Sequence, residues 1–164
     1  MNEQSTWRIW PALLMAVALQ TTWLAHWRPG GGAIDLPLLL VVSVALQLGW
    51  EMGAAYGLCA GLLMGFYAGT NLGSYAMSRL ITGGLLGLFE RRFSRDNPFT
   101  PPLCAMGAVV VANAIFLIIS PTDFPVMWWL RYTASSLLAH AILIYPVHWL
   151  VTKFILPPPR TMFG

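Results

Sequence analysis

The chain has 164 residues, of which 57% are hydrophobic and only 9% are charged. Its mean hydropathy of +0.66 lies above the range of soluble globular domains, so the composition indicates an integral membrane protein. At about 20 residues for each crossing, the chain holds about six helices and leaves no room for a soluble domain, and its net charge of +3 rests on too few basic residues to indicate nucleic-acid binding.

We expect an all-α integral membrane protein with six transmembrane helices, folded as a single transmembrane domain over residues 1–164. Short polar, glycine-rich or proline-rich connections separate the apolar segments, and tryptophans stand at several of their ends. The first segment has no convincing signal-peptide cleavage site, so we expect it to remain as a helix. The expected spans cover about residues 7–25, 34–50, 53–69, 73–89, 102–120 and 130–155.

Asp35 stands at the mouth of the second span, and Pro37 follows it in the first turn. An acidic side chain at a helix start complements the helix dipole, and proline is tolerated in the first turn. Capping of the helix is therefore the simplest role for Asp35. The turn at residues 49–52 is very short, so the second and third spans are expected to be antiparallel neighbours.

The third span contains glycine at every fourth position, and a smaller glycine pair lies in the fourth span. Glycine costs a soluble helix about 1 kcal/mol relative to alanine, whereas in a bilayer small residues four apart let a neighbouring helix approach closely. The row therefore predicts a helix-packing face, either for another helix of this chain or for a helix of a partner protein. The glycines are Gly53, Gly57, Gly61, Gly65, Gly69 and Gly73, with Gly83 and Gly87 in the fourth span.

Several polar side chains lie inside the predicted spans. Arg79 lies in the fourth span, and a membrane-embedded arginine costs about 3 kcal/mol on insertion scales. It therefore either extends to the membrane surface or pairs with a helix end, with Asp35 or with an acid of a partner protein. Asn113 is expected to form an interhelical hydrogen bond. The candidates for a polar interior are Asp35, Arg79, Asn113 and His140, and Gln20 and Gln47 are further polar groups within the spans.

The densest charged stretch follows the fourth span and contains a basic loop of Arg91, Arg92 and Arg95. We expect this loop to meet an acidic cytoplasmic surface or anionic lipid. With six spans, the loop and both ends of the chain share one side, and the excess of basic residues there places that side in the cytoplasm. The basic residues on this side are Arg8, Arg91, Arg92, Arg95, Lys153 and Arg160, whereas Arg28 and Arg131 lie on the other.

The sequence carries no recognisable catalytic or metal-binding pattern. It has no pair of intramembrane aspartates, no HExxH motif and no glycine-rich phosphate loop before a lysine. His26, His140 and His148 are spread over different faces and depths, so packing roles are favoured over a metal site. Cys59 and Cys104 fall inside spans and are expected to be buried thiols. We therefore expect no enzymatic activity, no metal and no cofactor.

Three short motifs follow one another in a recognisable order. They combine an acidic helix start, a glycine-rich third span that ends in a polar turn, and a glycine-rich fourth span that is followed by basic residues. They are Asp35, the run GLCAGLLM at residues 57–64 with TNLG at 70–73, and the run GGLLG at 83–87 with Arg91 and Arg92.

In size, number of spans and these motifs, the chain resembles MreD, a family of small multispanning membrane proteins of the bacterial rod-shape (elongation) machinery. The resemblance covers residues 34–95 by motif and the remainder by hydropathy. It implies a non-enzymatic scaffold or regulatory subunit in the bacterial inner membrane that binds MreC through transmembrane helix packing. It also implies association with the RodA-like SEDS glycosyltransferase and the penicillin-binding transpeptidase of lateral peptidoglycan synthesis, and with the actin-like MreB.

MreD-like proteins are similar in fold to the substrate-binding S-components of energy-coupling-factor transporters, and an S-component is the alternative function. Such a protein would capture a vitamin or another small molecule. Ala12 and Ala16, four residues apart on the first span, would then form the small-residue face that meets the coupling protein. A channel or an enzyme has little support.

Overall fold

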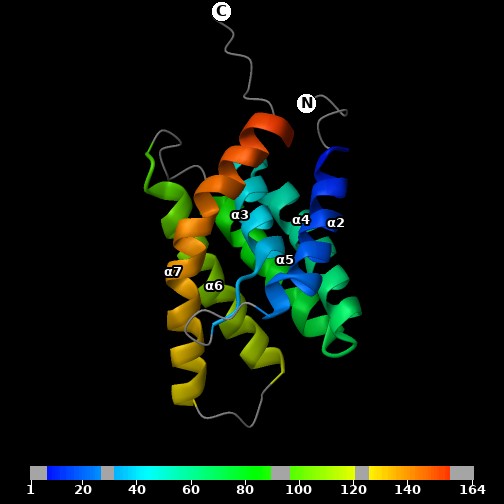
Figure 1. Ribbon diagram of the computed structural model, residues 1–164, viewed down its shortest axis with the longest axis vertical. Coiled ribbons are helices and arrows are strands. Elements are labelled where there is room, and N and C mark those ends of the chain that lie inside the picture. The colour runs from blue at the N-terminus through cyan, green and yellow to red at the C-terminus, as the bar shows by residue number, and fades with distance from the viewer. Residues whose placement is uncertain (1–6, 27–31, 90–96, 121–125, 156–164) are drawn as a thin grey trace, which may run out of the picture.

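A computed structural model of the chain describes residues 7–26, 32–89, 97–120 and 126–155. Within these residues the protein is all-α, with six α-helices that lie side by side (Figure 1). A short 3₁₀ turn, η1 (Leu24–His26), follows the first helix, and a π-helical turn, η4 (Val151–Ile155), extends the last. The helices are α2 (Ile9–Thr22), α3 (Leu36–Leu48), α4 (Trp50–Ala68), α5 (Leu72–Phe89), α6 (Thr100–Ile119) and α7 (Val126–Leu150).

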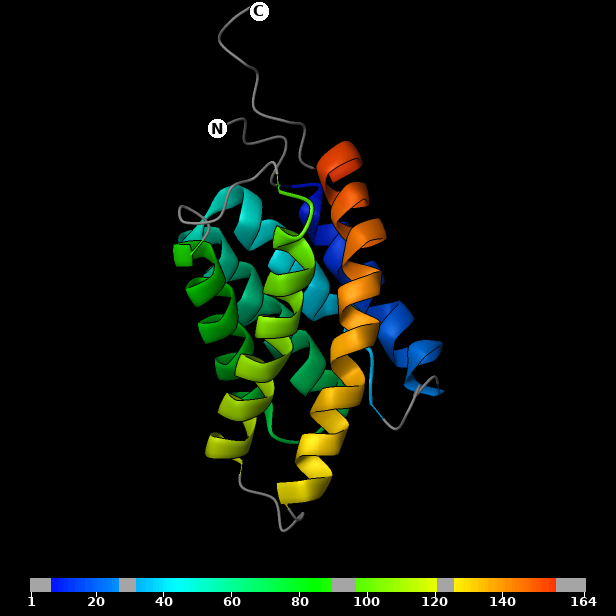
Figure 2. The same cartoon turned by 90° about the vertical axis from the view of Figure 1, so that its left-hand side faces the viewer.

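Consecutive helices run in opposite directions, and α3 lies among the others (Figures 1 and 2). It contacts α2, α4, α5, α6 and α7, and every one of its residues from Pro37 to Leu46 is buried. A helix that is apolar on all sides belongs in such a position, because it has no polar face to turn outward. The predominantly apolar sequence of α3, in which Ser43 and Gln47 are the polar side chains, thus explains why this helix forms the centre of the bundle.

Two hydrophobic clusters pack on different faces of α3. On one face, Leu40, Val41 and Val44 contact side chains of α2, α4 and η4. On the other, the neighbours of α3 are side chains of α6 and α7. The first cluster also contains Ile9, Leu13, Ala16, Tyr56, Ala60 and Val151, and the second contains Leu38, Leu39, Val42, Leu46, Cys104, Ala105, Ala108, Val109, Ala112 and Ile144.

The connection between α4 and α5 is a tight reversal. Gly69 ends α4 with φ of 66°, and Asn71 follows with φ of 54°. Both values lie in the left-handed region, which glycine adopts freely and asparagine adopts more readily than most residues. These two residues turn the chain within a few positions, so α5 folds straight back along α4.

The number and order of helices agree with the six predicted spans, but the first two helices are shorter than expected. α2 has 14 residues and α3 has 13, so α3 is about 20 Å long against a hydrocarbon layer of about 30 Å. Among the described residues, two helical stretches are long and apolar enough to cross a membrane, Thr100–Ile119 and Val126–Phe154. The predicted second span is shortened at its start, because the chain stays non-helical until Leu36.

Candidate functional site

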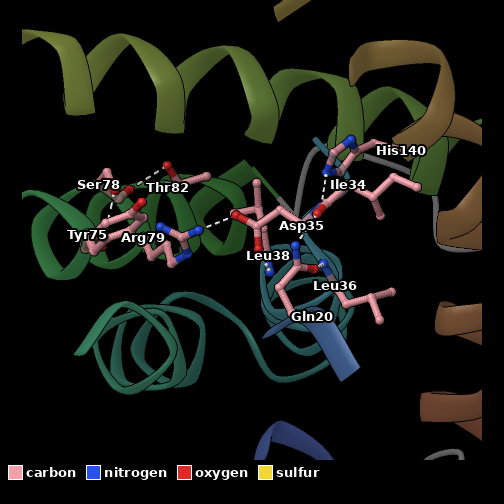
Figure 3. Close-up of polar contacts among 10 residues, drawn as sticks. All are labelled: Gln20, Ile34, Asp35, Leu36, Leu38, Tyr75, Ser78, Arg79, Thr82 and His140. Carbon is pink, nitrogen blue, oxygen red and sulfur yellow. Dashed lines mark hydrogen bonds and ion pairs between the residues drawn. The ribbon is translucent and has the colours of Figure 1, made fainter. Parts of the chain in front are cut away.

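Residues 32–35 lead into α3 as a non-helical segment that is largely buried. Ile34 is 2% exposed, and the backbone of Gly32 lies directly against α7, where a Cβ on Gly32 would come within 2.7 Å of the Ser136 backbone nitrogen. Backbone N–H and C=O groups in such a segment have no helical partners and need others, because leaving them unpaired in an apolar interior is costly. Side chains of α2 and α7 supply partners for this backbone, and α5 contributes a partner for the side chain of Asp35 (Figure 3).

Gln20, from α2, bridges the backbone on both sides of Asp35. Its Nε2 donates to the carbonyl oxygen of Ile34 at 2.5 Å, and its Oε1 accepts from the N–H of Leu36 at 3.0 Å. One amide side chain thus replaces the backbone partners that a neighbouring strand would provide. Gln20 is itself only 8% exposed, so its own polar atoms also gain their partners here.

His140, from α7, holds the same segment from another side. Its Nε2 lies 3.0 Å from the backbone nitrogen of Asp35, and its Nδ1 lies 2.7 Å from the carbonyl oxygen of Ser136. The backbone N–H of Asp35 can only donate and the carbonyl of Ser136 can only accept. The ring is therefore neutral, with its proton on Nδ1. The side chain is 1% exposed, as expected for an imidazole with both nitrogens engaged.

Asp35 uses both oxygens of its carboxylate. Oδ1 accepts from the N–H of Leu38 at 3.0 Å, which caps the start of α3, and Oδ2 forms an ion pair with Nη2 of Arg79 on α5. The guanidinium carbon also lies 5.1 Å from the centre of the Tyr75 ring, within the range of a cation–π contact. Capping and ion pairing thus occur together in one side chain.

Arg79 is buried in this arrangement rather than extended to a surface. It is 5% exposed, whereas the side chain of Asp35 is 22% exposed. Of the alternatives for Arg79, the structure shows pairing with Asp35. One of its atoms, Nε, is buried without a hydrogen-bond partner among the described residues. We call Gln20, Asp35, Arg79 and His140 the polar cluster.

The glycine row of α4 packs against α5 of the same chain. A Cβ on Gly57 would overlap the carbonyl oxygen of Arg79, so the two backbones are in direct contact. This close approach also sets the position from which Arg79 reaches Asp35. Of the two predicted uses of the row, the structure shows packing within the chain, with α5 against Gly53, Gly57, Gly61 and Gly65. The remaining close pairs are Gly53 with Gly83, Gly61 with Tyr75 and Ala76, Gly65 with Leu72, and Gly87 with Trp50.

Two glycines of the predicted row have other positions. Gly69 ends α4 in the left-handed conformation, and an added Cβ there would meet nothing within 4 Å. Gly73 lies in the first turn of α5 and is likewise surrounded by open space. The four-residue spacing of the glycines thus continues past the contact between α4 and α5. Because α4 ends at Ala68, the last two glycines lie outside this helix.

Asn113 lies outside the polar cluster. Its Nδ2 donates to Oγ1 of Thr133 at 3.3 Å, which ties α6 to α7 by the expected kind of interhelical bond. The basic loop residues Arg91, Arg92 and Arg95 lie outside the described residues. Sequence reasoning named Gln20 only as an isolated polar group, and its lone position in an apolar span was the available signal.

Among the described residues, no group of three or more histidine, cysteine, aspartate or glutamate side chains is arranged to hold a metal ion. The polar cluster instead directs its side chains at backbone atoms and at one another. Its effect is to fix the non-helical start of α3 between α2, α5 and α7. The chain matches no protein-family model, no curated protein and no solved structure.

Proposed function

We propose that this chain is a multi-pass scaffold or regulatory subunit of the MreD type. It would cross the bacterial inner membrane six times and bind MreC through helix packing. It would thereby join the RodA-like glycosyltransferase, the penicillin-binding transpeptidase and the actin-like MreB in lateral wall synthesis. The observation that carries the proposal is that residues 34–95, where the resemblance is strongest, include the interlocked unit of α3, α4 and α5, joined by glycine contacts and by Asp35 with Arg79.

A non-enzymatic role is supported by how the polar cluster is used. A catalytic or transport site needs polar groups that are free to bind a substrate. Here Gln20 and His140 are occupied by the backbone at the start of α3, and the Asp35 carboxylate is occupied by its cap and by Arg79. These side chains hold the helices and the start of α3 in place, which is what a rigid scaffold requires.

A membrane location for the whole bundle is supported by its outer surface. Large apolar side chains stand outward on the short helices as well as on the two long ones, which water would disfavour and lipid would accept. Leu138 and Ile142 on α7 are each 70% exposed. Other outward apolar residues are Leu14 and Met15 on α2, Phe66 on α4, Leu88 on α5 and Ile118 on α6.

The positions of the described basic residues support an orientation with both termini in the cytoplasm. Arg8 precedes α2 and Lys153 lies in η4, and both lie at the same end of the bundle (Figure 1), where Ile9 and Val151 belong to one hydrophobic cluster. Arg131 lies in the first turns of α7, at the opposite end of the bundle. In this orientation the polar cluster lies toward the outer side of the membrane.

The S-component alternative loses its supporting feature. Ala16 is 9% exposed, and Ala12 packs against the cluster formed by α2, α3 and α4. The small-residue pair on α2 thus packs toward the interior of this bundle, Ala12 only in part, which weakens the support for a coupling face there.

Co-expression with MreC of the same organism tests the proposal. Because α5 covers the glycine row, the MreC helix must pack on an outward face, and substitutions there should weaken co-purification without unfolding the chain. We would compare L14W on α2, G107L on α6 and L138W on α7, since Gly107 has open space around it and the two leucines are exposed. The substitution G61L serves as the control for misfolding.

We expect MreC to co-elute with the unmodified chain, and one outward variant to lose MreC while keeping its elution volume and melting temperature. Absence of MreC from the purified chain would contradict the proposal. Stabilisation by a vitamin, together with co-purification of two ATPases and a coupling protein, would favour an S-component instead.

A further inference from the structure

His140 is placed so that its second proton cannot be added without breaking a contact. Nε2 accepts the N–H of Asp35 and Nδ1 donates to the carbonyl of Ser136, so the contact at Asp35 exists only with a neutral ring. We propose that His140 is an acid-sensitive latch, which holds the backbone N–H of Asp35 against α7 when neutral and, when protonated, releases this N–H and competes with Arg79 for the Asp35 carboxylate. Histidine is the side chain whose charge, when it is free in water, changes nearest to neutral pH.

Protonation changes which group His140 can bind. A proton from water on Nε2 turns this atom into a donor that faces another donor, the N–H of Asp35. The carboxylate of the same residue is then the acceptor that the imidazolium can pair with, in competition with Arg79. The added charge would thus shift Asp35 from the pair with Arg79 toward His140 and loosen the start of α3.

The surroundings of His140 allow this exchange. On the α3 and α5 side, the charged groups are Asp35 and Arg79, which neutralise each other. From α2 the cluster receives Gln20, which carries no charge. From α6 the side chains that reach α7 include Asn113 and Cys104, of which only the thiol can titrate, and a thiol does so in the alkaline range. On α7 itself, the ionisable groups in the neighbouring turns are Tyr132, Tyr145 and His148.

The cluster reaches the surface of the bundle at Asp35, whose side chain is 22% exposed. The segment that would move is small, and at Gly32 only backbone atoms lie against Ser135 and Ser136. In the orientation proposed above, this part of the surface faces the outer side of the membrane. In that orientation His140 would respond to acid outside the cell. The proposed effect of protonation itself follows from the contacts of His140 and holds in either orientation.

The test uses the full chain in detergent, without any partner, so its result is independent of MreC binding. The substitution H140Q provides one acceptor and one donor on a neutral side chain, which imitates the neutral ring at every pH. The substitution H26Q is the matched control, because His26 is exposed at the end of η1. Unfolding temperatures would be measured from pH 8 to pH 5 for the three proteins.

We expect the melting temperature of the unmodified chain and of H26Q to fall by about 4 °C from pH 8 to pH 5, and that of H140Q to stay level over this range. The same fall in H140Q, or no fall in the unmodified chain, would overturn the proposal. A nitroxide at position 33, in a chain with C59A and C104A, provides a second measurement that keeps His140. Its mobility should rise on acidification, and an unchanged spectrum would also overturn the proposal.

Discussion

Asp35 and Arg79, 44 positions apart in the sequence, form an ion pair that joins the first turn of α3 to the interior of α5. A buried pair of this kind adds little net stability over a well-packed apolar pair, but removal of one partner leaves the other charge buried alone. The pair therefore requires the α4–α5 hairpin to lie at one register on α3. The two charges thus determine how the helices are placed relative to one another and add little to the free energy of unfolding.

The substitution D35N keeps a good capping side chain but removes the charge that neutralises Arg79. We expect it to lower the free energy of unfolding by about 3–5 kcal/mol, because the guanidinium is left buried and unpaired. Chemical unfolding in detergent measures this loss. The double variant D35N/R79M should recover at least half of it, and a double variant as unstable as the sum of the two single ones would show that the ion pair is not the cause.

The glycine contacts between α4 and α5 predict opposite effects for two alanine substitutions. In G57A the new Cβ overlaps the carbonyl oxygen of Arg79, so we expect a loss of about 1–3 kcal/mol from overpacking. In G107A on α6 the new Cβ meets open space, and the gain in helix propensity should stabilise the protein by up to about 1 kcal/mol. Equal effects of the two substitutions on thermal unfolding would argue against the close helix contact.

The two glutamines inside the predicted spans should also differ. In Q20L the carbonyl of Ile34 and the N–H of Leu36 lose their partner, at about 1–3 kcal/mol for each buried group. In Q47L little should be lost, because Nε2 of Gln47 is buried without a hydrogen-bond partner among the described residues. Unfolding curves of the two variants, measured side by side, test this difference in stability. A Q47L protein less stable than Q20L would contradict the role we assign to Gln20 in holding the backbone before α3.

The helices themselves follow from the sequence, because their apolar runs are bounded by recognisable ends. Asp35 with Pro37 begins α3, as the sequence predicts, whereas Gly69, which the sequence assigns to the packing row, instead ends α4. The regular glycine spacing likewise predicts a close helix contact. The glycine spacing alone, however, does not show whether the packing helix belongs to this chain or to another protein. The short turn at Asn71 is the feature that brings α5 onto the row.

The polar cluster could be predicted only in part. Asp35 and Arg79 were candidates as charges in apolar surroundings, but a separation of 44 residues leaves their pairing to the packing of three helices. The roles of Gln20 and His140 depend on backbone groups of residues 32–36, and a contact between a side chain and a distant backbone produces no periodic pattern. The early end of α2 and the late start of α3 created the need for these contacts.

The most direct test of the proposed function is isolation of the tagged chain from its native membrane, followed by mass spectrometry of the proteins that accompany it. The account predicts that MreC is recovered together with the RodA-like glycosyltransferase and the penicillin-binding transpeptidase. Recovery of two ATPases and a small coupling membrane protein, without any wall-synthesis protein, would contradict it and identify the chain as the substrate-capturing component of a transporter.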